Sequence, residues 1–141
     1  MRIERVDDAA TVRAGAELFD GPPLDAATEH FLASSAHHLL FAYDDTSRVV
    51  GMVSGVETTH PDKGTEMFLY ELGVAPVARG RGLATALVRA LDALARERGC
   101  YGMWVDVDAN NFAALATYHR AGAQQEAPTV TLSWDLTLPP D

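Results

Sequence analysis

Apolar residues recur along the chain with two spacings, one typical of strands and the other of helices. Short apolar runs bounded by turn residues predict strands. Such runs lie at residues 3–6, 38–43, 49–57, 66–75, 102–107 and 130–136. Leu83, Leu87, Leu91 and Leu94 are three or four residues apart, which predicts the apolar face of one long helix. Gly99 is expected to end this helix.

Three shorter helices are predicted where a polar capping residue precedes apolar residues at helical spacing. The first follows Asp7 or Asp8, the second is capped by Asp25, and the third is capped by Asn110 or Asn111. The order of elements is therefore β-α-α-β-β-β-α-β-α-β. This order predicts an α/β fold with a mixed central sheet flanked by helices.

The composition fits one domain of ordinary size, because the chain has 141 residues, of which 48% are hydrophobic. We expect this domain at residues 1–136 and a short tail at residues 137–141, which contains two prolines. No apolar run has the length of a membrane span. The single Cys100 excludes an intramolecular disulfide framework, and the first residues do not resemble a signal peptide. Cytoplasmic residence is therefore expected.

The formal net charge of −9 narrows the choice of partner. Nucleic-acid binding needs a basic face, so no nucleic-acid partner is expected. An acidic protein attracts small cations, although acidity also serves solubility alone. One cysteine and five scattered histidines give no zinc-ligand spacing, so no metal is expected. Four of these histidines are expected at the surface, namely His30, His37, His38 and His60.

A glycine- and arginine-rich turn separates the fourth apolar run from the long helix. It reads Arg79-Gly80-Arg81-Gly82-Leu83-Ala84. Glycines allow a ligand to approach the backbone, and a helix N-terminus offers free N–H groups to a phosphate. The pattern lacks the lysine of a Walker A loop, and Thr85 replaces the third glycine of a dinucleotide fingerprint. An ordinary strand–turn–helix connection remains the alternative at this point.

Two motifs in this chain resemble those of the GCN5-related N-acetyltransferase (GNAT) family. The acetyl-CoA-binding pattern of this family is Q/R-x-x-G-x-G/A, which Arg79, Gly82 and Ala84 match. The second pattern is N-x-x-A-x-x-L-Y-x-x-x-G-F. Its matching residues are Asn111, Ala114, Tyr118 and Gly122, whereas Thr117 and Ala123 depart from it. The resemblance implies a mostly antiparallel GNAT sheet over nearly the whole chain.

The resemblance also implies acetyl-CoA as cosubstrate and a set of residues that bind it. Tyr118 would donate a proton to the departing thiolate, although a buried core position is its alternative role. Asn111 would bind the pantetheine arm, and a helix N-cap is its alternative role. The full set is Leu72, Gly73, Val74, Arg79, Gly80, Arg81, Gly82, Leu83, Ala84, Thr85, Asn111 and Tyr118.

Four carboxylates are candidates for the acceptor side. By resemblance, Glu71 would hold or deprotonate the acceptor amine. Asp106, Asp108 and Glu57 end neighbouring strands and could bind a cationic acceptor. For each carboxylate the alternative is a solvated charge at a loop or strand end, and for Glu57 and Asp106 we expect this alternative to apply.

Within the family, the stretch FLYELGVAPVARGRGLATALV is similar to the central block of the aminoglycoside 3-N-acetyltransferases, which confer antibiotic resistance. The resemblance implies an aminoglycoside acceptor and a homodimer. Another small amine, such as a polyamine or an amino acid, is the first alternative acceptor. A non-catalytic acetyl-CoA-binding module is the second alternative. Trp104 and Trp134 are expected to anchor the core or the dimer surface.

Overall fold

The computed structural model describes residues 1–137 and contains one five-stranded sheet. The strands are paired in chain order, with three antiparallel pairings followed by one parallel pairing between β4 and β5. The strands are β1 (Arg2–Arg5), β2 (His37–Tyr43), β3 (Val49–His60), β4 (Gly64–Val74) and β5 (Met103–Trp104). The predicted mixed, mostly antiparallel sheet is confirmed.

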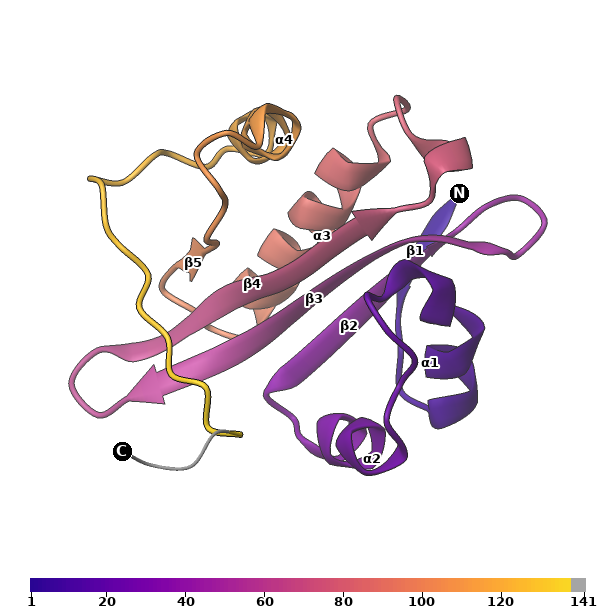
Figure 1. Ribbon diagram of the computed structural model, residues 1–141, viewed down its shortest axis with the longest axis horizontal. Helices are drawn as coiled ribbons and strands as arrows, with labels where there is room; N and C mark the ends of the chain where they lie inside the picture. Colours follow the sequence, from indigo (N-terminus) through magenta and orange to yellow (C-terminus); the bar gives the residue numbers. More distant parts are fainter. Residues whose placement is uncertain (138–141) are drawn as a thin grey trace.

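Helices cover both faces of this sheet (Figure 1). The short helices of the N-terminal part are α1 (Ala9–Ala14), η1 (Ala16–Leu18) and α2 (Asp25–Ala33). The helices after β4 are η2 (Pro76–Ala78), α3 (Leu83–Glu97) and α4 (Phe112–Arg120). Within residues 1–137, no helix combines the length and the apolar character needed to cross a membrane.

Alternation along β2 divides the core between the two faces. Leu40 and Ala42 belong to the larger cluster, in which the apolar face of α3 packs on the sheet. Leu39 and Phe41 belong to the smaller cluster, together with residues of α1, η1 and α2. The leucine stripe predicted for the long helix is therefore confirmed, since Leu87 and Leu91 are fully buried in the larger cluster.

A β-bulge in β4 changes which side chains face each helix layer. Ser54 of β3 is opposite Glu71, whereas the next residue of β3, Gly55, is opposite Leu69. Tyr70 is therefore an extra residue without a direct partner. Met67 and Leu69 face α3 before the bulge, and Leu72 faces α3 after it. Consequently, both Tyr70 and Glu71 are directed to the face away from α3.

Several predicted elements differ from the structure. The strand expected at residues 102–107 is reduced to β5, because only Met67 and Phe68 of β4 pair with it. The strand expected at residues 130–136 does not form, since these residues are exposed and have no strand partner among residues 1–137. Asp25 is the first residue of α2 and does not cap it. Apart from Thr137, the tail expected at residues 137–141 lies outside the described residues.

Candidate functional site

The loop between β4 and α3 has the geometry of an anion-binding turn. Gly80 and Gly82 have φ angles of 76° and 78°, a left-handed conformation that favours glycine. Gly82 is the N-cap of α3, and no side chain caps this helix start. The first intrahelical bond runs from the Ala86 N–H to the Gly82 carbonyl at 3.0 Å. The N–H groups of residues 83–85 are therefore free to bind an anion.

Three side chains of this loop were predicted to hold the coenzyme. The Nε of Arg79 donates to the Val74 carbonyl at 3.2 Å, which ties the loop to the end of β4. Arg81 is exposed and makes no hydrogen bond or ion pair with residues 1–137. Thr85 is 5% exposed, and its Oγ1 has no partner within the same residues. Because this hydroxyl is enclosed, Thr85 would contact a ligand through its backbone N–H group.

The sheet opens beside this loop, where β4 continues past the end of β5. The Ala75 N–H donates to the Val50 carbonyl of β3 at 2.8 Å. Alternation along the strand then directs the N–H groups of Leu72 and Val74 to the opposite, unpaired edge. This edge can hydrogen-bond an extended ligand as an added strand would. A Cβ on Gly73 would lie 3.5 Å from the Leu18 carbonyl, so this glycine faces η1 rather than the unpaired edge.

Tyr118 lies on α4 and belongs to the core cluster on the α3 side of the sheet. It lines a cavity of about 630 Å³ bounded by Leu69 of β4, residues 103–107, α4 and residues 122–129. The residue is only 9% exposed, and burial raises the pKa of its phenol above the ordinary value. The hydroxyl therefore remains protonated at neutral and mildly alkaline pH, as a proton donor requires.

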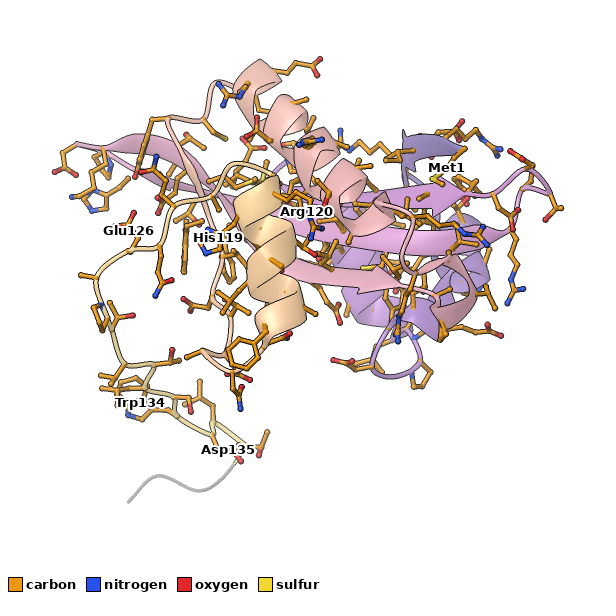
Figure 2. The ribbon with its side chains drawn as sticks, turned by 90° about the horizontal axis from the view of Figure 1, so that it is seen from above. Met1, His119, Arg120, Glu126, Trp134 and Asp135 are labelled. Atoms are coloured by element: carbon orange, nitrogen blue, oxygen red, sulfur yellow. The ribbon has the colours of Figure 1, made fainter. Side chains whose placement is uncertain are left out.

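Asn111 and His119 mark the two ends of α4. Asn111 is the N-cap, and its Oδ1 accepts from the Ala114 N–H at 3.1 Å, so the capping role is confirmed. Its side-chain NH₂ group remains available to a ligand. His119 follows Tyr118 by one position, and its Nδ1 lies 3.1 Å from the Ala123 carbonyl. Figure 2 shows its ring directed toward the segment that follows α4.

Glu71 lies on the opposite side of the opening, on the face that carries α1 and α2. It is half-buried, and its pKa is raised, first by burial and then by the negative charge of Asp20. Asp20 belongs to the exposed loop between η1 and α2. Asp20 could not be predicted as a site residue from the sequence, because nothing in the local pattern indicates that this loop approaches β4.

The other carboxylates predicted for the acceptor side separate into two groups. Asp106 and Asp108 are exposed on the segment after β5, and Asp106 lines the cavity that Tyr118 faces. Glu57 lies in a different environment. It accepts from His38 Nε2 at 2.6 Å and from Arg98 Nε at 2.9 Å, and its side chain is 9% exposed.

Glu57 is therefore part of a buried ion-pair network near the end of α3, and we leave it out of the acceptor site. Burial raises the pKa of its carboxyl, but the hydrogen bonds and charges of His38 and Arg98 outweigh this effect and lower it. His38 was expected at the surface, which is wrong, because this residue is completely buried. Burial lowers the pKa of His38 against the opposing effect of Glu57, which favours the neutral ring.

The glycine loop, the open edge of β4 and the phenol of Tyr118 belong to the two motifs, and the strand before them, that resemble the GNAT family. Residues 7–123 match the model of the acetyltransferase (GNAT) family, and the chain belongs to this family. Among curated proteins it is similar to mycothiol acetyltransferase of Rhodococcus jostii, with 30% identity over 132 residues. This match covers 84% of the chain and 43% of that protein. The chain spans about half the length of the curated relatives that it matches.

Two solved structures have the same fold. One is an aminoglycoside acetyltransferase from an uncultured soil metagenomic sample, with a TM-score of 0.86 and 18% identity. The match covers 96% of this chain and 95% of that one. The other is the aminoglycoside N-acetyltransferase AAC(6')-Iy in complex with CoA, with a TM-score of 0.79 and 20% identity. There the coverage is 94% of this chain and 93% of the other. At these identities the likeness establishes the fold, and the predicted α/β GNAT fold is confirmed.

Proposed function

We propose that this protein is an acetyl-CoA-dependent N-acetyltransferase that acetylates a primary amine of a small cationic acceptor. The observation that carries the proposal is the opening between β4 and β5. An anion-binding glycine loop follows β4 there, Glu71 lies on the sheet face away from α3, and Tyr118 of α4 lies in the core cluster of the other face. A thioester ligand held there along the edge of β4 would expose its carbonyl between a proton donor and a carboxylate.

The residues around the opening divide the chemistry between them. The loop at residues 79–85 would bind the pyrophosphate, and the N–H groups of Leu72 and Val74 would hold the pantetheine arm and the acetyl carbonyl. Glu71 would attract the ammonium group and accept its proton, directly or through water, so that the neutral amine can attack. Tyr118 would protonate the departing sulfur. The Asn111 amide would donate to the pantetheine arm.

The acceptor we propose is an aminoglycoside. The central block FLYELGVAPVARGRGLATALV favours acetylation at nitrogen 3, whereas one neighbour of the same fold is named for the 6' position. Both positions are amines of a polycationic sugar, which suits Glu71, Asp20 and an overall charge of −9. The modified nitrogen is a property of the acceptor pocket and is decided by analysis of the product.

The test is coenzyme A release from acetyl-CoA with gentamicin, kanamycin, apramycin, spermidine and several amino acids. Release with aminoglycosides alone supports the proposal, and mass spectrometry with NMR then locates the acetylated nitrogen. Release with spermidine or amino acids alone would keep the reaction and reject the acceptor. Binding of acetyl-CoA without turnover of any amine would support the non-catalytic alternative instead.

A matched pair of variants tests the base. Glu71→Gln removes the carboxylate at nearly constant volume, whereas Glu97→Gln does the same at the exposed end of α3. We expect Glu71→Gln to lower kcat/KM by about 10²-fold or more. It should also remove the rise in rate with pH that follows the raised pKa of this carboxyl. Equal activity of the two variants would exclude Glu71 as the base.

A homodimer is the assembly that we propose. The alternating residues Val130, Leu132 and Trp134 are 76% to 84% exposed on the segment after α4. Figure 2 shows this segment extending away from the sheet to Trp134. A second copy with an open β5 edge could cover it. Sedimentation should give a dimer mass, and Trp134→Asp should shift it toward the monomer. A monomer at all concentrations would reject this assembly.

A further inference from the structure

Three aromatic side chains form a row on the sheet face that is directed away from α3. We call Phe68, Tyr70 and Trp104 the aromatic row. The rings of Phe68 and Trp104 are stacked, with centroids 4.2 Å apart and an interplanar angle of 27°. The Tyr70 ring meets Phe68 edge-on, with centroids 6.0 Å apart and an angle of 76°. Tyr70 is 71% exposed and Trp104 is 44% exposed.

The bulge of β4 and the parallel pairing with β5 explain how the row forms. Phe68 of β4 is directly paired with Trp104 of β5, which brings their rings together on one face. Tyr70 follows Phe68 by two residues and so shares its face, and the bulge places Glu71 on the same face beside it. Beyond Trp104, exposed positions continue at every second residue, so Asp106 follows on the same side. Because β5 is parallel to β4, Asp106 and Glu71 both lie toward the Tyr70 end of the row.

Such a surface suits a cation. The faces of aromatic rings carry negative electrostatic potential and attract ammonium groups within about 6 Å, most strongly at tryptophan. Glu71 and Asp106 add negative charge toward the Tyr70 end of the row. Phe68 is three residues before Glu71 on β4, and at a rise of about 3.3 Å per residue it lies roughly 10 Å from Glu71 along the strand.

We propose that the aromatic row is a second acceptor subsite, which holds another ammonium group of the molecule whose amine is acetylated beside Glu71. The proposal rests on the proposed acetyl transfer and defines its substrate class further. The acceptor has at least two cationic nitrogens, separated by about 7–10 Å when both subsites are filled. A monoamine fills only the subsite beside Glu71 and is the poorer substrate.

Two apolar occupants could compete for the row. Trp134 is at the far end of the C-terminal segment in Figure 2, away from the sheet. The homodimer proposed above would place residues 130–134 of a second copy along the edge of β5, whereas the row lies on the face of the sheet beside Glu71 and Asp106. Charge complementarity therefore favours a small cation.

Tryptophan fluorescence tests the subsite without turnover. The chain has two tryptophans, so Trp134→Phe leaves Trp104 as the sole emitter. Titration of this variant with 1,6-diaminohexane should change the emission saturably, and hexylamine, with the same chain and one ammonium group, should require a roughly fivefold higher concentration or more. Adding Glu71→Gln should weaken diamine binding, because the second ammonium group loses its anchor.

Matched variants then test specificity in the reaction. Trp104→Ala or Tyr70→Ala should raise KM roughly fivefold for the acceptor found in the panel, with kcat little changed. Tyr101→Ala is the control, because this tyrosine is 59% exposed, lies outside the row and donates to Glu66 at 3.1 Å. Acetyl-CoA affinity should be unaffected in all three.

Different results would overturn the proposed subsite and the proposed acetyl transfer. Equal binding of the diamine and hexylamine, or no saturable change at Trp104, would overturn the subsite even if acetyl transfer is observed. An emission change that follows protein concentration and ignores the amine would overturn it in favour of a second copy as the occupant. Saturable diamine binding without any turnover would support the subsite while rejecting the proposed reaction.

Discussion

The left-handed glycine at the start of α3 allows a quantitative test of the coenzyme loop. Gly82 has a φ angle of 78°, and a Cβ added there would meet no atom within 4 Å. Gly82→Ala therefore adds no steric clash, and its cost is that of placing an L-residue in the left-handed region. This cost is about 1–2 kcal/mol.

The same substitution at the other end of the helix is the matched control. Gly99 follows α3 with a φ angle of 79° and also has no atom within 4 Å of its virtual Cβ. Gly82→Ala and Gly99→Ala thus share the backbone penalty and the loss of unfolded-state entropy. They differ in the end of α3 that they flank and in their distance from the proposed pyrophosphate site.

The backbone penalty should weaken coenzyme binding in Gly82→Ala and lower the unfolding free energy in Gly99→Ala. Residues 79–82 are exposed, so in the Gly82→Ala variant the loop would be free to leave the left-handed conformation. Binding of the coenzyme would then have to restore this conformation, and the cost of doing so would weaken the affinity. We expect acetyl-CoA to bind Gly82→Ala roughly 5- to 30-fold more weakly, and Gly99→Ala to lose about 1 kcal/mol of unfolding free energy with unchanged affinity. Calorimetric titration and urea unfolding measure both quantities.

One pattern of results would refute the reasoning. If Gly82→Ala changed neither the coenzyme affinity nor the unfolding free energy, the left-handed conformation would not be required. Equal loss of affinity in both variants would mean that the effect spreads through α3 and is not specific to the loop.

Three further predictions concern the acid, the core and the buried ion pair. Tyr118→Phe should cut kcat by about 10²-fold and leave acetyl-CoA affinity unchanged in calorimetry; unchanged turnover near neutral pH would exclude it as the acid. Leu91→Ala should cost about 2–5 kcal/mol in urea unfolding, because this side chain is fully buried against β3 and β4, and a loss under about 1 kcal/mol would contradict its packing. The lowered pKa of His38 means that the unfolded chain binds more protons, so stability should fall as pH drops below about 6.5. His38→Gln should flatten the unfolding free energy between about pH 7 and 5.5, and an unchanged slope would assign the effect to other groups.

The sequence predicted the elements whose signals are local. Leucines at helical spacing define α3, and the glycines that flank it need no distant partner to adopt their conformations. Asp8 and Asn111 cap their helices within three residues.

Features that depend on pairing between distant segments could not be predicted in this way. The burial of His38 requires both the register of β2 with β3 and the approach of Arg98 from the end of α3. The segment at residues 130–136 has the alternation of a strand, but a strand also needs an edge to pair with. The position of Asp20 beside Glu71 likewise depends on where a loop crosses the sheet.

The bulge in β4 has a consequence for recombination between relatives of this protein. Before Tyr70 the odd-numbered residues of β4 face α3, and after it the even-numbered residues do. If a segment from a relative kept the same number of residues but ran through this point as a regular strand, every later side chain of β4 would be rotated to the opposite face. Leu72 would then be turned away from α3 and Glu71 toward the leucines of α3. Removal of Tyr70 alone would instead leave Leu72 and Glu71 on their present faces, since Glu71 would then follow Leu69 in regular alternation. Chimaeras should therefore tolerate loss of the extra residue better than loss of the bulge at constant length.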